Sequence, residues 1–351
     1  MNVRLEKLIS FFNPGKIDAY LVTKEINIVY LTGFPASESW LLVSPQKTFY
    51  LTDSRYVLEA QKGLKGLASV SCYAGSIFEM VFQIAKEKRI KRIGFDERHL
   101  TLAQYNALKE KCPPTIKFVG RNGLIENLRE QKDPQEIKKI KKALNIHQQA
   151  LKFIKPFIKP RISEQEILER LESFVKSKKA SFSFPPIIAS GENSCYPHAR
   201  VTDRKLRPDD IVLLDMGIDV FGYKSDLTRM SFLGKIPPLV RHVNECVRAA
   251  QQKAIAKIKP GIRVSLIDQE ARNYLAKHKL AKFFGHALGH GVGLEIHESP
   301  RLSKDSAAVL REGMVITVEP AVYVPKKFGI RLEEMVLVTP EGFEVLSADI
   351  D

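Results

Sequence analysis

The sequence predicts a two-domain protein that mixes helices and strands. Its 351 residues suffice for two domains of ordinary size, and its apolar fraction of 44% and charged fraction of 27% are typical of globular chains. Short apolar segments alternate with helical patterns in the first part, whereas apolar strands broken by glycine turns dominate after residue 187. We therefore expect an α/β domain over residues 1–130 and an α+β domain over residues 131–351.

The first domain is predicted from short strands and intervening helices. Apolar runs with the length of buried strands lie at residues 19–22, 28–31, 40–43 and 48–51. Helical spacing of apolar residues appears at 77–84 and 102–108. Strands interleaved with helices indicate a sheet covered by helices, and this pattern ends near Leu128.

Two helix starts open the second domain. Asp133 is a good N-cap, Pro134 fits the first helical position, and Glu136 completes a capping-box pattern. Ser163 and Glu166 repeat the capping-box spacing. Apolar residues at helical spacing follow both starts, so each predicts an amphipathic helix.

The net charge of +15 raises the question of nucleic acid as a partner. The basic excess is spread over both halves, and its densest run, residues 138–142, lies on a predicted helix whose other face is apolar. A solvated helix face explains such a run as well as a phosphate-binding patch does. Because no nucleic-acid-binding motif accompanies it, we do not expect a nucleic-acid partner.

Cysteine usage and hydropathy predict a cytoplasmic protein. The cysteines are far apart and form no CxxC pair, which argues against a disulfide framework; they are Cys72, Cys112, Cys195 and Cys246. No apolar run is long enough to span a bilayer, and the first residues lack the apolar stretch of a signal peptide. We expect no membrane partner.

Two aspartates are predicted to share one face of a hairpin. Asp215 lies within the apolar segment 211–220, and Asp226 lies on the return strand. A two-residue turn at 221–222 would pair Asp215 with Thr228 and place Asp226 diagonally on the same face. A lone aspartate in a strand commonly marks a bulge or an edge. Two on one apolar face repel each other unless a cation, a proton or a basic group lies between them.

A second group of charged side chains repeats this arrangement. Glu319 ends an apolar strand that begins at Met314, and Arg331 and Glu333 share a face of a later strand. Taken alone, these residues fit a surface ion pair and a glutamate that caps a turn. Together with the two aspartates they indicate a buried polar site.

Three histidines lie close together in a glycine-rich segment. His286 and His290 have the i, i+4 spacing of a helical zinc site, but Ala287 stands where that motif has its catalytic Glu, and His297 follows. Glycines at 285, 289, 291 and 293 disfavour a helix and favour an irregular strand that approaches a ligand. A glycine-rich turn with incidental histidines is the alternative.

Four carboxylates and one imidazole are a suitable ligand set for two divalent ions that share bridging carboxylates. Oxygen-rich ligation favours Mn²⁺, while Co²⁺, Zn²⁺ or Fe²⁺ can also bind such sites. Water that bridges two such ions loses a proton near neutral pH and becomes a nucleophile. The sequence therefore predicts metal-assisted hydrolysis by a bridging hydroxide.

These residues resemble the pita-bread dinuclear metallopeptidases, in the branch of Xaa-Pro aminopeptidases and prolidases. The resemblance covers nearly the whole chain, because residues 27–34 are similar to the start of that branch's N-terminal domain. The motifs that carry it occur in the family's order: Leu214-Asp-Met-Gly, Ser225-Asp-Leu-Thr-Arg, His286-Ala-Leu-Gly-His-Gly-Val-Gly, Val318-Glu-Pro and Ile330-Arg-Leu-Glu.

The resemblance implies the pita-bread fold for the second domain, two bound divalent ions, a homodimer and proline-containing peptides as substrates. It also implies the metal ligands, which are Asp215, Asp226, His290, Glu319 and Glu333. Glu319 is further implied as the proton shuttle for the attacking water.

Other site residues are carried over in the same way. His198 matches a histidine near the scissile bond, His297 one that stabilises the oxyanion or binds the substrate carbonyl, and His286 a further histidine of the substrate pocket. Arg331 and Tyr323 match groups that orient the site.

Two positions depart from the family pattern. Ala321 stands where Gly often follows Glu-Pro, and Glu334 stands where Asp often follows the ligand Glu. Neither is a ligand position, so they concern local backbone detail.

The resemblance implies an Xaa-Pro aminopeptidase first, with a prolidase that cleaves only Xaa-Pro dipeptides as the nearest alternative. The long N-terminal domain argues against a methionine aminopeptidase. A non-catalytic binding scaffold would not need all five ligands.

Overall fold

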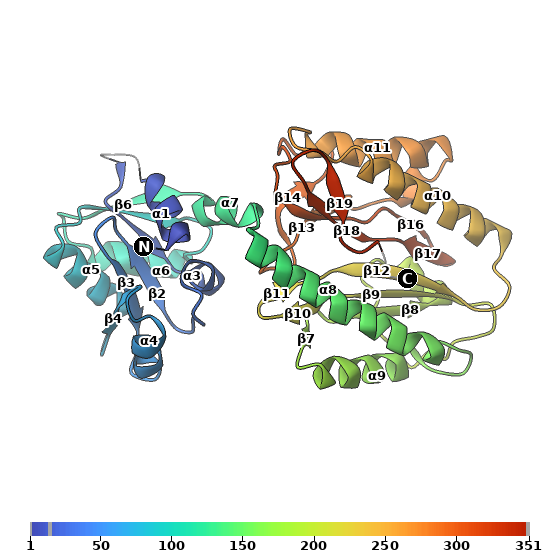
Figure 1. Cartoon of the computed structure of the whole chain (residues 1–351), viewed down its shortest axis with the longest axis horizontal. Helices are drawn as coiled ribbons and strands as arrows, with labels where there is room; N and C mark the ends of the chain where they lie inside the picture. The colour runs from blue at the N-terminus through green and yellow to red at the C-terminus, as the bar shows by residue number, and fades with distance from the viewer. Residues whose placement is uncertain (1, 13–15, 349–351) are drawn as a thin grey trace. The chain divides into compact units, whose positions relative to one another are not determined.

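The computed structural model describes residues 2–12 and 16–348. The chain divides into two compact units, Met1–Arg129 and Glu130–Asp351, which Figure 1 shows in blue to cyan and in green to red.

The first unit is a mixed sheet with helices. Its strands are β1 (Ala19–Val22), β2 (Trp40–Val43), β3 (Thr48–Thr52), β4 (Ser69–Cys72), β5 (Arg92–Asp96) and β6 (Lys117–Arg121). Its helices are α1 (Val3–Ser10), α3 (Glu25–Thr32), α4 (Val57–Gly63), α5 (Ile77–Glu87), α6 (Leu102–Lys111) and α7 (Leu124–Glu130). The strand order is β4-β3-β2-β1-β5-β6, in which β1 pairs antiparallel with β2 and parallel with β5.

One predicted strand of this unit is wrong, whereas the other three strands and both helices are confirmed. Residues 28–31 lie in helix α3. A short apolar run fits a buried helix as well as a strand, because periodicity cannot separate the two over four residues. Gly33 ends the helix with a φ of 70°, a left-handed conformation that favours glycine.

The second unit contains more strands, most of them short. They are β7 (Ser181–Phe182), β8 (Ile187–Ser190), β9 (Ile211–Met216), β10 (Ile218–Val220), β11 (Tyr223–Lys224), β12 (Leu227–Phe232), β13 (Gly289–Gly291), β14 (Glu298–Leu302), β15 (Val315–Val318), β16 (Ala321–Val324), β17 (Phe328–Arg331), β18 (Glu334–Val338) and β19 (Phe343–Val345). Its helices are α8 (Pro134–Ile154), α9 (Glu164–Ser177), α10 (Pro238–Ile255) and α11 (Val264–Lys277), with short 3-10 turns at Lys155–Phe157, Gly191–Cys195 and Ala281–Phe283.

The strands of the second unit lie between two pairs of helices (Figure 1). α8 and α9 cover one side, and α10 and α11 cover the other. The sheets have the orders β12-β9-β8, β11-β10-β7, β14-β13-β15-β18-β19 and β16-β17. The largest apolar cluster joins α10 and α11 to β15, β16, β17 and β18, so the polar site described below is built on a packed core.

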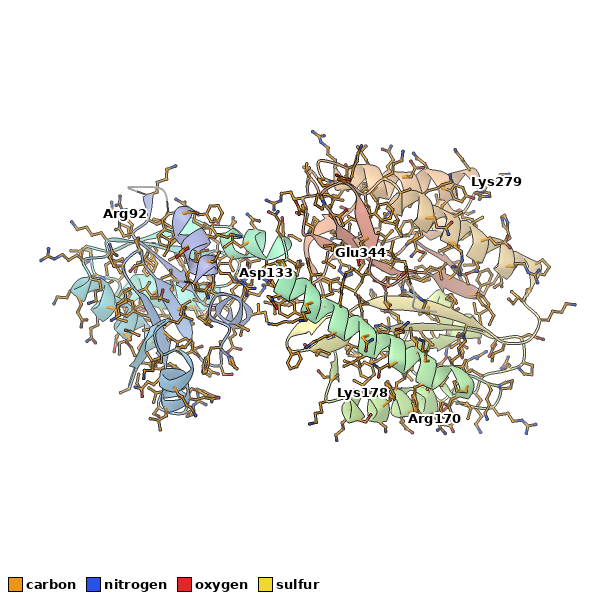
Figure 2. The ribbon with its side chains drawn as sticks, in the orientation of Figure 1. Arg92, Asp133, Arg170, Lys178, Lys279 and Glu344 are labelled. Carbon is orange, nitrogen blue, oxygen red and sulfur yellow. The ribbon has the colours of Figure 1, made fainter. Side chains whose placement is uncertain are left out.

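Both predicted helix starts are confirmed. The Asp133 carboxylate accepts hydrogen bonds from the N–H groups of Gln135 and Glu136, and the Glu136 side chain accepts from the N–H of Asp133. Figure 2 labels Asp133 at the start of α8. Ser163 and Glu166 form the same capping box at α9. The region beyond residue 187 was predicted as strands separated by glycine turns, but it also contains helices α10 and α11, which that prediction missed.

Lys138, Lys139, Lys141 and Lys142 are exposed on α8 while Ile140 is buried, as the pattern of apolar residues predicts. The four cysteines are free thiols. Within 2–12 and 16–348, none of the helices has both the length and the apolarity needed to cross a membrane.

Candidate active site

The first arm of the site is the predicted hairpin, and its register is confirmed. Asp215 on β9 is opposite Thr228 on β12, and the same register continues to the turn at 221–222. Phe221 and Gly222 both have positive φ, 56° and 81°, which is the geometry of a tight two-residue hairpin turn. Asp226, directly before β12, is buried on the same side as Asp215.

The second arm differs in one detail from its prediction. Glu319 directly follows β15, as expected, but Arg331 ends β17 and Glu333 lies between β17 and β18, so the two do not share one continuous strand. The strand ends here because β17 pairs with β16, whereas β18 pairs with β15. Arg331 and Glu333 still meet at Thr228 Oγ1, at 3.0 and 2.8 Å.

The glycine-rich segment is an irregular strand, as predicted. In β13 the register shifts between His290 and Gly291. A Cβ on Gly289 would lie 2.1 Å from the carbonyl oxygen of Thr317, and one on Gly291 would lie 2.2 Å from that of Ser299. Glycine is therefore required for β13 to approach its neighbours, and this approach places His290 above the carboxylates.

The structure brings the predicted ligand atoms together. Ligand atoms of Asp226, His290 and Glu333 all lie within 4.8 Å of one another. His290 Nε2 is 3.6 Å from Asp226 Oδ2 and 3.4 Å from Glu319 Oε1. Asp215 completes the group, and its Oδ1 is buried without a hydrogen-bond partner.

The pKa values of Asp226, Glu319 and Glu333 indicate that these three carboxyl groups carry more negative charge than the nearby Arg331 can balance. Burial, together with the charges of neighbouring carboxylates, raises the pKa of Asp226 and that of Glu333 well above their ordinary values. Burial and the charge of Asp215 raise the pKa of Glu319 to about 8, although Arg331 and Thr317 act in the opposite direction. Such carboxylates are stable in ionised form only if cations lie between them.

His290 is suited to be a neutral ligand. Its Nδ1 lies 3.1 Å from the carbonyl oxygen of Gly291, which can only accept, so Nδ1 carries the proton and Nε2 has a free lone pair. Burial and the nearby His297 lower its pKa to about 4. Divalent metal ions would give Asp215 Oδ1 a partner, offset the repulsion between the carboxylates and accept the lone pair of His290 Nε2.

Arg331 and Tyr323 anchor one edge of the site. The Arg331 guanidinium binds Asp215 Oδ2 and donates to the Tyr323 hydroxyl at 2.5 Å. Burial raises the pKa of Tyr323 to about 12, so its hydroxyl stays protonated. This hydroxyl donates a hydrogen bond to His286 Nε2 at 3.3 Å. His286 Nδ1 donates to the carbonyl of Ala287 at 2.8 Å, so both of its ring nitrogens are engaged within the protein.

His297 and His198 lie on the open side of the site. The rings of His297 and His290 are edge to face with centroids 4.3 Å apart, so His297 faces the site. Its neighbour Glu298 instead binds Lys132 at 3.1 Å. Burial and the charge of His198 lower the pKa of His297. His198 is exposed, and the carbonyl of the preceding Pro197 accepts a hydrogen bond from Arg331.

Several residues that hold the site were missed at the sequence level. Thr228 joins Arg331 to Glu333, and Gln251 on α10 donates to the carbonyls of Val318 and Leu332, directly before Glu319 and Glu333. Gln251 could have been predicted from the sequence, because a glutamine on the apolar face of an amphipathic helix is unusual.

Glu164 is a third missed residue. It is fully buried and accepts hydrogen bonds from Ser190, Asn193 and Thr202, which hold the segment that carries His198. Its position in the first turn of α9 gave a sufficient local reason for an acidic residue, so nothing in the sequence marked it out.

Known families match both units. Residues 138–340 match metallopeptidase family M24, and residues 4–131 match the creatinase/prolidase N-terminal domain. The chain belongs to metallopeptidase family M24. The resemblance seen in the sequence is therefore confirmed, and the chain is a metal-dependent peptidase with the predicted fold: an α/β N-terminal domain before a pita-bread catalytic domain.

Individual M24 proteins are similar to this chain along its whole length. The solved structure of an Xaa-Pro dipeptidase from Bacillus anthracis has 36% identity and a TM-score of 0.94, and the alignment covers 99% of this chain and 97% of that one. An X-Pro aminopeptidase from Thermotoga maritima has 32% identity and a TM-score of 0.89, with 98% and 97% covered. An Xaa-Pro dipeptidase from Pyrococcus horikoshii is 34% identical, with 99% and 97% covered.

Proposed function

We propose that this M24 peptidase hydrolyses the bond between an N-terminal residue and a following proline, as an Xaa-Pro aminopeptidase. The observation that carries the proposal is the buried group of Asp226, Glu319 and Glu333 around His290, in which burial and neighbouring carboxylates raise the carboxyl pKa values. The names of the similar proteins support the proline specificity.

Two divalent ions would be held by the five predicted ligands, Asp215, Asp226, His290, Glu319 and Glu333. Four carboxylates and one imidazole favour Mn²⁺ or Co²⁺ over ions that prefer thiolates. When bound, the ions supply Lewis-acid activation of the attacking water and of the peptide carbonyl.

The protein's own groups supply proton transfer and orientation. Glu319 is the proposed proton shuttle, because its carboxylate lies beside His290 at the edge of the ligand group, where it can accept a proton from the attacking water and return it. Neutral His297 can donate one N–H to the oxyanion that forms on the scissile carbonyl. Arg331 fixes Asp215 Oδ2 and leaves Oδ1 for an ion.

A prolidase, which cleaves only Xaa-Pro dipeptides, is the second candidate. It is favoured by the names of the Bacillus anthracis and Pyrococcus horikoshii proteins. Both activities need the same ligands and differ in whether the pocket continues beyond the proline.

Product analysis by mass spectrometry, with Mn²⁺ present, separates the candidates. The substrates are an Xaa-Pro dipeptide, a longer Xaa-Pro peptide and a Met-Ala peptide. We expect the first residue to be released from the longer Xaa-Pro peptide. Cleavage of the dipeptide alone would indicate a prolidase, and cleavage of only the Met-Ala peptide would contradict both candidates.

Chelation should abolish activity, and Mn²⁺ or Co²⁺ should restore it better than other divalent ions. The reason is that the carboxylates cannot activate water without a cation between them. Turnover is measured on protein whose metal content is known from elemental analysis. Full turnover in metal-free protein would refute the proposed site.

We also propose a homodimer, which sedimentation velocity can test. A cytoplasmic location stays a prediction that rests on the free cysteines.

A further inference from the structure

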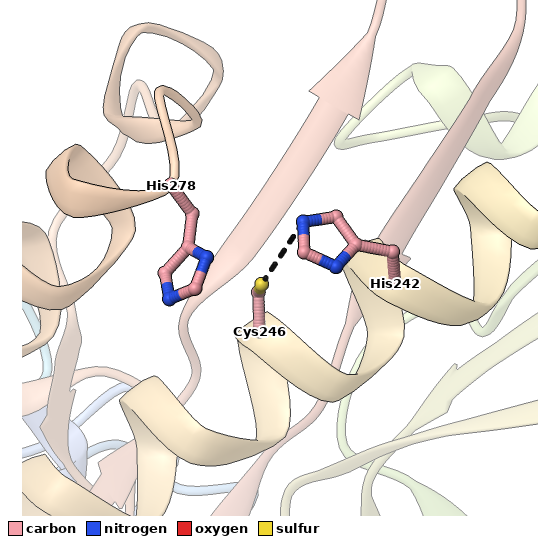
Figure 3. Close-up of side chains that lie close together, drawn as sticks. All are labelled: His242, Cys246 and His278. Atoms are coloured by element: carbon pink, nitrogen blue, oxygen red, sulfur yellow. Dashed lines mark hydrogen bonds between the residues drawn. The ribbon is translucent and has the colours of Figure 1, made fainter.

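A second cluster of metal-ligating side chains lies in the catalytic unit, outside the site above. His242, Cys246 and His278 offer two imidazoles and a thiol whose ligand atoms all lie within 4.8 Å of one another. Figure 3 shows the side chains converging from two segments. Three such clusters occur in the described part of the chain, and this one alone contains no carboxylate.

Two helices position these side chains. His242 and Cys246 are at i and i+4 on α10, so they share one face of the helix. His278 is the C-cap residue of α11, where the helix ends against α10. The ring centroids of His242 and His278 are 5.7 Å apart, and the ring of Tyr274, one turn earlier on α11, contacts His278 at a tilt, with centroids 4.9 Å apart.

The burial of the cluster suits a structural ion. Cys246 is only 3% exposed and belongs to the apolar core, whereas His242 is exposed. The thiol therefore lies at the boundary between core and solvent, where an ion can enter from the side of His242. An S–H···N bond from Cys246 to His242, at 3.7 Å, explains that pair but not the third donor, His278.

The spacing suits a tetrahedral ion. Zinc bonds of about 2.3 Å to sulfur and about 2.0–2.1 Å to nitrogen give a sulfur–nitrogen edge of about 3.6 Å in a tetrahedron. The Cys246 Sγ to His242 Nε2 distance of 3.7 Å is close to this edge. We propose that His242, Cys246 and His278 bind one Zn²⁺ ion, with water as the fourth ligand.

The donor set would separate this ion from those of the active site. Two imidazoles and a thiolate suit Zn²⁺ or Co²⁺, whereas Mn²⁺ prefers oxygen ligands. Binding converts the Cys246 thiol to a thiolate and releases its proton to solvent. The ion then links α10 to the end of α11.

Cobalt provides a direct test in the full-length chain. The protein is stripped of metal, saturated with Mn²⁺ and then titrated with Co²⁺. A thiolate bound to Co²⁺ gives a charge-transfer absorption in the near ultraviolet, and the proposed catalytic ligands include no sulfur, so the band reports a cysteine site. We expect one equivalent of Co²⁺ to produce the band and Zn²⁺ to remove it by displacement.

Matched variants identify the cysteine and its partners. Cys246→Ser should abolish the band, while Cys72→Ser, at an exposed cysteine of the other unit, should leave it unchanged. Because serine at a buried position can impair folding, His242→Ala provides a second variant on the exposed side. We expect His242→Ala and His278→Ala each to weaken Co²⁺ binding at least tenfold, with circular dichroism confirming a native fold.

Two results would overturn the proposal. One is the absence of a thiolate band in folded wild-type protein, and the other is a band of unchanged affinity in both histidine variants. Peptidase activity is a separate readout, so a chain that shows the band without cleaving peptides would contradict the proposed function and leave this site standing.

Discussion

Each unit contains a cluster of two carboxylates and one histidine that could hold a metal ion, yet the clusters have opposite electrostatics. In the first unit, Asp96, His99 and Glu126 are already matched by partners. Arg98 binds Asp96 at 2.9 Å and Glu126 at 3.1 Å, and the N–H of Gly123 donates to Asp96 at 2.7 Å.

The pKa values of this first cluster follow from those partners. Burial alone raises the pKa of Asp96, but Arg98 and the backbone N–H groups lower it below its ordinary value. Burial also raises the pKa of Glu126, yet hydrogen bonds from His99 and Asn27 bring it down to about 2. The negative charges are balanced without a metal, so we assign this cluster a structural role.

In the catalytic cluster, the nearby arginine does not offset the negative charge. Asp226 and Glu333 share their pocket with other carboxylates, and Arg331, which lowers both pKa values, is itself bound to Asp215. Burial and mutual repulsion raise their pKa values. Residue types and proximity therefore do not separate these two carboxylate clusters, whereas the direction of the pKa shift does.

The largest expected effect tests this distinction directly. Asp226→Asn should lower turnover to background and reduce bound metal, because the amide keeps the shape of the side chain but removes the charge that holds an ion. The metal-free variant should be at least as stable as metal-free wild type, since one repelling charge is gone. Steady-state kinetics, elemental analysis and urea unfolding are measured on one preparation. Near-normal turnover with two bound metals would remove Asp226 from the ligand set.

A smaller loss is expected for His297→Ala. His297 lies beside His290 without being one of the predicted ligands, so its removal should lower kcat by about 10²–10³ and leave the metal content unchanged. Metal lost in proportion to activity would make His297 a ligand, and an unchanged kcat would make it a bystander.

Local signals in the sequence predicted much of this structure. The hairpin register that joins Asp215 to Thr228 followed from a turn of two residues, and the helix starts at Asp133 and Ser163 followed from their capping boxes. These features depend on residues near one another in the chain.

What the sequence could not show depends on distant partners. The strand break at Glu333 results from pairing with two different neighbours, β15 and β16. Gln251 holds the ends of two strands through backbone carbonyls, which carry no sequence signal. The apolar residues 28–31 form part of helix α3 and not a strand, because four buried apolar residues are compatible with either conformation.

The units should respond oppositely to pH in metal-free protein. A carboxyl with a raised folded-state pKa favours the folded state at low pH, so Glu319 makes the catalytic unit less stable as pH rises from about 4.5 to about 8. The lowered pKa of Glu126 stabilises the first unit above about pH 4.5, and this stability is lost as pH falls toward about 2.

The single tryptophan makes these responses separable. Trp40 is buried in the first unit, so its fluorescence reports the unfolding of that unit, while circular dichroism reports both units. Between pH 5.5 and 8 we expect the midpoint of the dichroism transition to fall in metal-free protein and to be restored by Mn²⁺, with little change in the fluorescence transition. Equal shifts of both signals would contradict the contrast between the clusters.

The smallest effect is expected for Asp96→Asn, the counterpart of Asp226→Asn in the first unit. Asp96 is 7% exposed, and the substitution removes the charge that binds Arg98. Hydrogen bonds that involve a charged group contribute about 1.5–3 kcal/mol, and asparagine can keep part of this interaction, so the first unit should lose about 1–3 kcal/mol of unfolding free energy. Urea unfolding followed by Trp40 fluorescence measures the loss, with metal content and turnover as controls. The two substitutions should thus give opposite patterns, lost stability with activity kept here and lost activity with stability kept at Asp226. Loss of bound metal in Asp96→Asn would instead mean that the first cluster also binds an ion, and the direction of a pKa shift would no longer distinguish a metal site from a structural ion pair.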